Sequence, residues 1–117
     1  MLPQLSAAVR VFLCTRPTDL RKGFDGLSGL VQECFGQDLL TGHLFLFLNR
    51  RRDRIKILYF DRDGLAIWYK RLEVGSFEMP RTTDPNGLEL QPAQLTMILS
   101  GIDMSSARQR KRFRNAC

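Results

Sequence analysis

The sequence predicts a small α+β domain, in which an antiparallel β-meander of about four to five strands packs with two helices and is followed by a disordered basic tail. Two observations predict this fold class. Residues 43–72 are rich in β-branched and aromatic residues and alternate in polarity between two short polar breaks, whereas apolar residues in 20–35 recur at helical spacing. A chain of 117 residues normally forms one domain. We therefore expect a single domain at residues 1–103 and a basic tail at residues 104–117.

The meander is expected to have strands at residues 43–49, 54–61 and 65–72. Residues 50–53 form the first polar break, and residues 62–64 form the second. Asp63-Gly64 between two β-rich runs is a strong hairpin signal, because glycine accepts the positive φ that such turns need. Links this short allow only antiparallel neighbours.

Both faces of the predicted meander carry apolar residues. One face is expected to be covered by the chain's own helices, and the other would hold aromatic residues beside Lys56 and Lys70. Aromatic rings interleaved with cations suit base stacking and phosphate contact. The alternative, which we favour, is that this face is also covered by a helix or a second subunit, because large aromatic residues are usually buried. The candidate interaction face consists of Phe45, Phe47, Phe60 and Trp68.

Further elements are expected on both sides of the meander. Residues 9–14 form a short strand that pairs with it, and residues 88–90 form a short edge strand. A second helix begins at Pro92, a favoured first helical residue, and stops at Gly101.

The first helix is expected from Leu20 to Phe35, with Thr18 or Asp19 as its N-cap. Each internal glycine costs a helix about 1 kcal/mol relative to alanine, so the three in this segment need close backbone packing or a frayed first turn. Basic residues near the helix start either point to water or meet a phosphate there. The glycines are Gly23, Gly26 and Gly29, and the basic residues are Arg16, Arg21 and Lys22.

Several function classes are excluded by what the sequence lacks. No run of about 18 apolar residues exists to span a membrane, and the N-terminus lacks the pattern of a signal peptide. The three cysteines are widely spaced and the only histidine is His43, so we expect no zinc site, no other metal and no cofactor. Cys14 and Cys34 are expected to be small core residues in a reducing compartment.

Catalytic motifs for phosphate-binding loops, serine hydrolases and zinc proteases are absent. Asp61 and Asp63 could bind Mg²⁺ as a carboxylate pair, but aspartate is also a favoured turn residue. We therefore expect no catalytic residues.

Positive charge is concentrated in two places. The chain has a net charge of +6, and residues 50–56 hold five bases against one acid, while the five bases of the tail face no acid after Asp103. Such segregation is typical of a nucleic-acid-binding protein, although a solvated hairpin and a solubilising tail would have the same composition. The candidate DNA-binding residues are Arg50, Arg51, Arg52, Arg54, Lys56, Lys70, Arg71, Arg108, Arg110, Lys111, Arg112 and Arg114.

The chain resembles a known family over residues 16–103. The matching positions are Pro17, Asp19, Arg21, Lys22, Gly23, Gly26, Leu27, Gly42, Leu44, Phe45, Phe47, residues 49–56, Leu58, Tyr59, residues 61–64, residues 68–73, Gly75, Phe77, Pro80, Leu99, Gly101 and Ile102. These residues are similar to those of the TnpB accessory proteins of the insertion sequence 66 family, which are distinct from the far longer RNA-guided nucleases of the same name. Phe60 departs from the tryptophan that is common there. The basic tail lies outside the resemblance.

The resemblance implies a role in DNA transposition. In that family a separate, larger protein is the transposase, and the small protein is an accessory without established catalytic residues. We expect a non-enzymatic cytoplasmic protein that can associate with the nucleoid and that binds element-end DNA, the transposase or both. The alternative is a protein-interaction module, a homodimer or a transposase-docking domain, without direct DNA contact.

Overall fold

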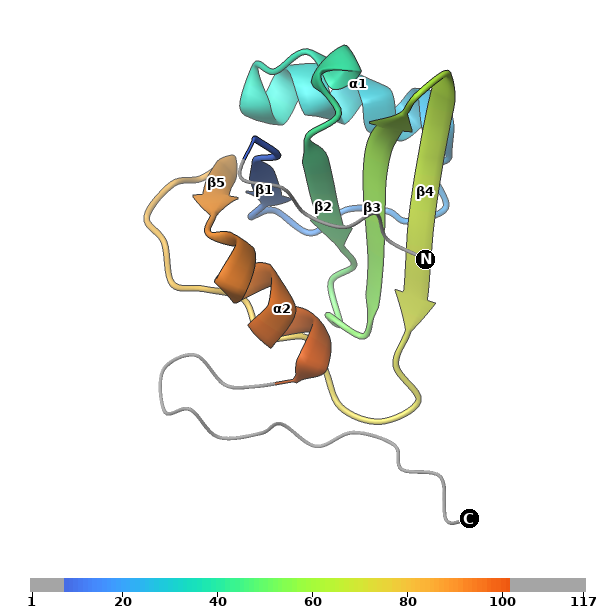
Figure 1. The fold of residues 1–117 in the computed structure, drawn as a ribbon. Coiled ribbons are helices and arrows are strands. Elements are labelled where there is room, and N and C mark those ends of the chain that lie inside the picture. The colour runs from blue at the N-terminus through green and yellow to red at the C-terminus, as the bar shows by residue number, and fades with distance from the viewer. Residues whose placement is uncertain (1–7, 102–117) are drawn as a thin grey trace.

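A computed structural model describes residues 8–101 of the 117-residue chain. Five strands form one mixed sheet in the order β4-β3-β2-β1-β5, and one helix covers part of each face (Figure 1). In chain order the elements are β1 (Val11–Cys14), α1 (Phe24–Phe35), the 3₁₀ turn η1 (Leu39–Thr41), β2 (Leu44–Leu48), β3 (Arg54–Asp61), β4 (Gly64–Arg71), β5 (Gly87–Leu90) and α2 (Pro92–Ser100). The predicted α+β class is confirmed. The predicted tail lies outside the described residues.

The meander is present as β2, β3 and β4, which pair antiparallel. β1 pairs in parallel with β2, and β5 pairs antiparallel with β1 at the opposite edge of the sheet. The parallel pair follows from the helix between the two strands, because α1 carries the chain back to the end of the sheet where β1 began. The sheet is therefore mixed, and only three of its five strands belong to the meander.

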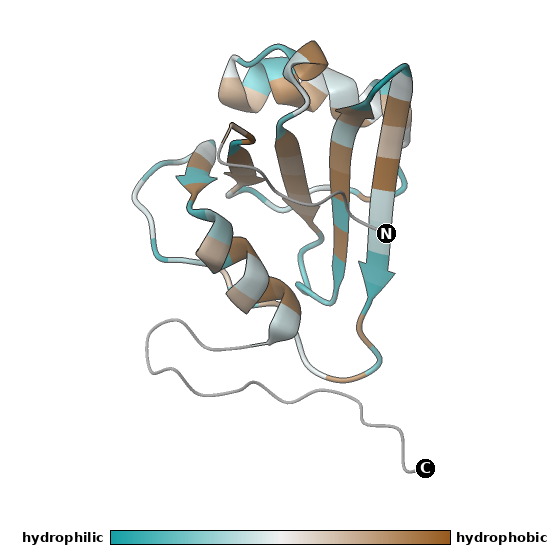
Figure 2. Ribbon diagram, in the orientation of Figure 1, coloured by the Kyte–Doolittle hydropathy of each residue, from teal (hydrophilic) through white to brown (hydrophobic). Residues whose placement is uncertain are grey.

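The central strand β2 is buried along its whole length, so the sheet has apolar layers on both faces (Figure 2). Leu44, Leu46 and Leu48 pack with Leu95 and Ile98 of α2. On the opposite face, the rings of β2 pack beneath α1 with its apolar side chains, which are Leu27, Val31 and Cys34.

The expectation that four aromatic residues share one face is wrong. Phe45 and Phe47 lie on the α1 face and have no exposed surface. Trp68 is paired with Ile57 and packs on the α2 face. Lys70 is paired with Ile55 and so lies on the same face. Cross-strand partners project to the same face, so Trp68 cannot join Phe45 and Phe47. The alternative that we favoured, in which the aromatic face is covered, is confirmed for the two rings of β2.

Both hairpin turns of the meander place their positive φ at arginine. In the second turn Asp61 is paired with Gly64, so Arg62 and Asp63 are the two turn residues and Arg62 has φ 56°. Gly64 begins β4 and does not supply the left-handed residue that we expected of it. In the first turn Arg52 has φ 58°.

Helix α1 begins at Phe24, four residues later than predicted, and its N-cap is Gly23 rather than Thr18 or Asp19. The Asp19 carboxylate accepts the Arg21 backbone N–H at 3.0 Å, which closes a local turn before the helix. Arg21 and Lys22 therefore precede α1. A Cβ at Gly23 or Gly29 would meet no atom within 4 Å, so close packing within the described chain does not explain these glycines.

Helix α2 has the predicted limits. Pro92 is its first residue, the Gln94 side chain accepts the Gln91 backbone N–H at 2.7 Å, and Gly101 ends it with φ 82°.

Gly87, at the start of β5, is a glycine whose missing side chain matters. A Cβ there would lie 2.6 Å from two ring carbons of Phe35 and 3.3 Å from the Cys34 carbonyl oxygen. Because Phe35 packs against the rings of Phe12, Phe45 and Phe47, it has little room to move. We expect Gly87→Ala to lower the free energy of unfolding by about 1–3 kcal/mol in urea denaturation.

The matched control is Gly29→Ala, which adds the same methyl group to open space in α1. It should leave stability unchanged or raise it by up to about 1 kcal/mol. Equal effects of the two substitutions would contradict this account of Gly87.

Candidate functional site: a basic groove

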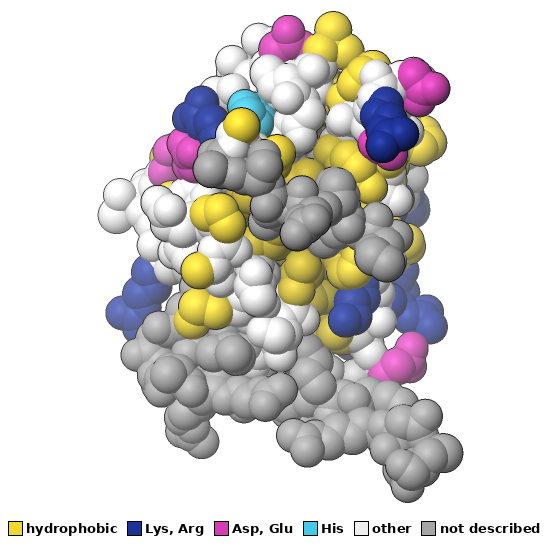
Figure 3. Space-filling model, viewed as in Figure 1, with side chains coloured by type: hydrophobic (Ala, Val, Ile, Leu, Met, Phe, Trp, Pro, Cys, Tyr) yellow, Lys and Arg dark blue, Asp and Glu magenta, His cyan; other side chains and the backbone are white. Residues whose placement is uncertain are grey.

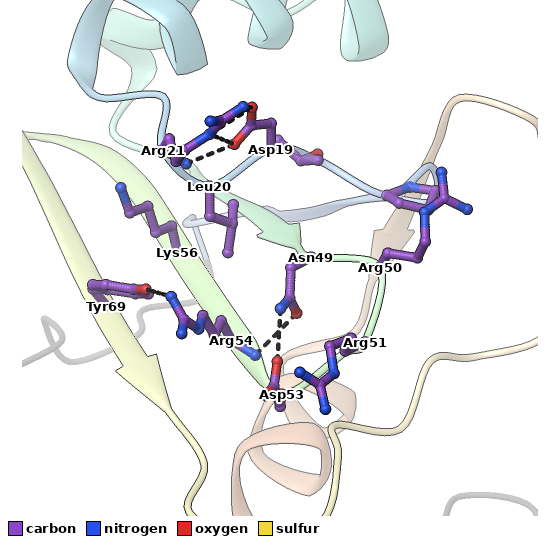
Figure 4. Close-up of a pocket in the computed structure, with 12 residues that line it drawn as sticks. Asp19, Leu20, Arg21, Asn49, Arg50, Arg51, Asp53, Arg54, Lys56 and Tyr69 are labelled. Atoms are coloured by element: carbon purple, nitrogen blue, oxygen red, sulfur yellow. Dashed lines mark hydrogen bonds and ion pairs between the residues drawn. The ribbon is translucent and has the colours of Figure 1, made fainter.

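A surface groove of about 860 Å³ lies between the β2–β3 turn and the loop that precedes α1 (Figure 4). We call it the basic groove. Its lining residues are Pro17, Thr18, Asp19, Leu20, Arg21, Asn49, Arg50, Arg51, Asp53, Arg54, Lys56 and Tyr69. Five bases and two acids line it, so the groove carries an excess of positive charge.

One wall is the 17–22 loop, which is held against the sheet. The Thr18 backbone N–H donates to the Leu48 carbonyl oxygen at 2.8 Å, and the Leu20 side chain is buried among the residues beneath α1. The Lys56 Nζ of β3 donates to the Lys22 carbonyl oxygen at 3.0 Å. These contacts fix the loop at the end of β2 and so position Arg21 across from the turn.

The other wall is the β2–β3 turn, which is organised by Asn49. The Asn49 Nδ2 donates to the Asp53 carboxylate at 2.6 Å, and the Asn49 Oδ1 accepts the Arg54 backbone N–H at 3.1 Å (Figure 4). The hydrogen bond from Asn49 lowers the pKa of Asp53, with a smaller contribution from the nearby positive charges of Arg51 and Arg54. Asp53 therefore stays ionised and orders the turn.

The segment after β4 also supports this turn from outside. The Leu72 backbone N–H donates to the Asp53 carbonyl oxygen at 2.7 Å, and the Phe77 backbone N–H donates to the Arg52 carbonyl oxygen at 2.6 Å. Phe77 is only 1% exposed and belongs to the core on the α2 face. The arginines thus project from a braced turn rather than from a loosely tethered loop.

Three arginine side chains of the β2–β3 hairpin form no ion pair with the described part of the chain. Within residues 8–101, no carboxylate lies within ion-pair distance of Arg50, Arg51 or Arg54, and all three side chains are exposed. Arg54 Nη1 donates to the Tyr69 hydroxyl at 3.4 Å, and Lys56 Nζ lies 5.0 Å from the centre of the Tyr69 ring. The Tyr69 side chain, which is 49% exposed, therefore places an aromatic ring beside Arg54 and Lys56.

The two acids of the groove already have partners. Asp53 is bound by Asn49, and the Asp19 carboxylate accepts from the Arg21 guanidinium at 2.7 Å. This side-chain hydrogen bond lowers the pKa of Asp19 to about 2, aided by the Arg21 backbone N–H. Because the folded value is depressed, the pair stabilises the fold fully above about pH 4. The contribution is lost as pH falls through about 2.

We expect the Asp19 carboxyl carbon to titrate near pH 2 in NMR spectra of the full chain. Arg21→Gln should raise that midpoint toward the ordinary aspartate value, because it removes the guanidinium donor. The same Asp19 midpoint in both proteins would show that Arg21 does not hold this carboxylate.

The groove gathers only part of the predicted set. Arg50, Arg51, Arg54 and Lys56 line it, whereas Arg52 lines a separate groove of about 670 Å³ with residues 78–82. Lys70 lies on the α2 face, and Arg71 is 3.6 Å from Glu73. On the face viewed in Figure 3, basic side chains lie at the edges and hydrophobic ones across the middle. Five predicted residues, Arg108, Arg110, Lys111, Arg112 and Arg114, lie outside the described residues.

Asn49 and Tyr69 are among the lining residues that were not predicted as site residues. They bear no charge, so a search for basic clusters passes over them. Tyr69 could have been found from strand register, because it is the cross-strand partner of Lys56 and therefore shares its face.

Residues 8–101 contain no group of three or more histidine, cysteine, aspartate or glutamate side chains that could hold a metal ion. None of the helices in this part of the chain has the length and apolar character needed to cross a membrane.

The fold and the groove define a small α+β protein with a cationic surface groove and an aromatic side chain beside it. The family model of IS66 Orf2-like proteins matches residues 9–109, so the chain belongs to this family, the TnpB accessory proteins of insertion sequence 66 elements. The family implies an accessory role in transposition. The match extends to residue 109 and so includes the first residues of the tail, including Arg108, beyond the resemblance that we described.

Two relatives from Sinorhizobium fredii are similar to this chain. The uncharacterised protein y4hO is 39% identical over 103 residues, which are 88% of each chain. The uncharacterised protein y4jC is 30% identical over 105 residues, covering 90% of this chain and 89% of the relative. No solved structure matches the chain.

Proposed function

We propose that the chain is a non-enzymatic accessory protein of transposition that binds the sugar–phosphate backbone of element-end DNA in the basic groove. The observation that carries the proposal is the set of exposed guanidinium groups, Arg50, Arg51 and Arg54, without carboxylate partners in residues 8–101. Cations projecting from a braced turn can meet phosphates without first breaking internal ion pairs. We place this protein in the bacterial cytoplasm, where the element's DNA lies.

Such binding would depend strongly on salt and only weakly on sequence. Lysine and arginine contacts to phosphate release counterions, so affinity falls as salt rises. Phosphate contacts position a protein on DNA but do not read bases. The uncharged side chains of the groove lining that can form hydrogen bonds are those of Thr18, Asn49 and Tyr69. We therefore assign this chain the role of holding or shaping the element ends for the separate transposase.

The test is fluorescence anisotropy of a labelled element-end duplex titrated with the full chain at several salt concentrations. Saturable binding should weaken linearly in a plot of log affinity against log salt, with a slope of about −0.9 for each phosphate neutralised. The absence of binding at low salt, or binding that does not respond to salt, would contradict the proposal. Incubation of the same duplex with Mg²⁺ should leave it uncut, and cleavage lost in Asp61→Ala would indicate a nuclease instead.

The second candidate is docking of the transposase, and the observation that favours it is the edge strand β4. This strand has eight residues and pairs only with β3 among the described strands, so its outer edge is free to receive a strand from a partner. Gel filtration with light scattering should report the mass of the chain alone and mixed with the transposase. A complex that persists when DNA binding is lost would support docking, and a doubled mass without transposase would indicate a homodimer.

A further inference from the structure

Two cysteines far apart in the sequence lie side by side in the fold. Cys14 ends β1 and Cys34 lies in the last turn of α1, and the Cys14 thiol donates to the Cys34 Sγ at 3.8 Å. Both are free thiols, with only 2% and 9% of their surface exposed. The chain leaves β1 after Cys14 and enters α1 after residue 23. The last turn of α1 then places Cys34 beside Cys14.

The surroundings of the two sulfur atoms differ. Arg16 Nη2 donates to the Cys34 Sγ at 3.1 Å, so a positively charged group faces this sulfur. The Cys14 Sγ accepts from Thr18 Oγ1 at 3.9 Å, and the Arg16 carbonyl oxygen, at 3.6 Å, is the alternative acceptor for its single proton. Burial raises the pKa of the Cys14 thiol, which keeps it protonated. The two sulfur atoms thus differ in their partners, with Cys34 facing the Arg16 guanidinium and Cys14 lying 3.8 Å from Cys34.

A small cavity gives access to the pair. It has a volume of about 190 Å³ and is lined by both cysteines. The exposed residues Arg16, Lys22 and Glu33 form its outer part, so it opens to solvent. A molecule the size of hydrogen peroxide fits in this space, whereas a folded protein cannot reach the sulfur atoms.

We propose that Cys14 and Cys34 form a redox-active dithiol that peroxide converts to an intramolecular disulfide. The Cys34 thiolate attacks one oxygen of hydrogen peroxide, the O–O bond breaks, and Cys34 sulfenic acid and hydroxide form. The Cys14 sulfur then attacks the Cys34 sulfur, and the sulfenic oxygen leaves as water with the Cys14 proton. Two thiols are oxidised, and one peroxide is reduced.

The disulfide would link β1 to the C-terminal turn of α1 beside the basic groove. Pro17, Thr18 and Asp19 line both the thiol cavity and the groove, so the modified site lies directly behind one groove wall. To form the bond, the sulfur atoms must approach from 3.8 Å to about 2 Å. This proposal does not depend on DNA binding.

The test is treatment of the full reduced chain with hydrogen peroxide, followed by alkylation of the remaining thiols and peptide mass mapping. We expect one peptide pair joined through Cys14 and Cys34, a protein mass lowered by two hydrogen atoms, and a single alkylated cysteine at Cys117. Arg16→Gln should slow the reaction about tenfold, because it removes the positively charged group that faces the Cys34 sulfur. Arg62→Gln, at the exposed β3–β4 turn and outside the lining of the thiol cavity, is the matched control and should react at the original rate.

Three outcomes would overturn the proposal: both core thiols alkylated after peroxide, a disulfide that joins Cys117 of two chains instead, or equal rates in the two arginine variants. The Cys117→Ser variant removes the intermolecular route and should still yield the Cys14–Cys34 link. Both arginine side chains are exposed, so these variants keep the test valid where a substitution at Cys14 would disturb the core.

Discussion

Replacing Arg50 and Arg51 together by glutamine is expected to weaken binding to element-end DNA about a hundredfold at low salt. Each lost charge-assisted contact is worth about 1.5 kcal/mol or more, which is about tenfold in affinity. The slope of log affinity against log salt should become shallower by about 2, because two phosphate contacts are lost. Fluorescence anisotropy over a range of salt concentrations measures both quantities.

The matched control replaces Arg62 and Arg81 by glutamine. Both are exposed arginines that do not line the basic groove, although Arg81 lines the neighbouring groove. The control therefore removes the same net charge from outside the basic groove. It should lower affinity by a small, nonspecific amount. If the two double variants bind equally, the attraction is a property of net charge and not of the basic groove. Arg52 lines the neighbouring groove, so Arg52→Gln tests whether the site is wider than proposed.

Phe77→Ala is expected to destabilise the domain by about 3–5 kcal/mol, a large share of the stability of a domain of this size. The Phe77 side chain is 1% exposed and packs in the core on the α2 face, so its removal leaves a cavity. Its backbone N–H also holds the Arg52 carbonyl oxygen at 2.6 Å. Urea denaturation followed by tryptophan fluorescence measures the loss, and Trp68 is the reporter.

Phe24→Ala is the control for Phe77→Ala. The Phe24 side chain is 47% exposed at the start of α1, and its removal should change stability by no more than about 0.5 kcal/mol. A cost below about 1 kcal/mol for Phe77→Ala would mean that the segment after β4 does not brace the groove as described.

Local sequence signals predicted the elements whose limits depend on local chemistry. The alternation in 54–61 coincides with β3, and Pro92 and Gly101 enclose α2 as expected. The start of α1 was misplaced because Asp19 looks like an N-cap, but its carboxylate instead binds Arg21. The parallel pairing of β1 with β2 joins segments that are far apart in the sequence. It depends on how α1 packs and not on any residue within β1.

Only part of the candidate site was predicted, because the other part also depends on contacts between segments that are far apart in the sequence. Adjacent arginines at a turn are visible in the sequence, and the turn at residues 49–53 does present Arg50 and Arg51 to a groove. The facing 17–22 loop is brought there by tertiary contacts such as that between Thr18 and Leu48. The error in placing Trp68 arose at the β3–β4 turn, where a two-residue connection decides which residues pair across the strands and so which face each one occupies.

The most direct test of the basic groove is an NMR titration of the ¹⁵N-labelled full chain with an element-end duplex. We expect the side-chain Nε–Hε signals of Arg50, Arg51 and Arg54 and the backbone signal of Tyr69 to shift together and to saturate with the DNA. Added salt should return them to their starting positions. If the duplex binds while these four signals stay still and those of α2 move, the DNA lies elsewhere on the molecule and the groove is not its site.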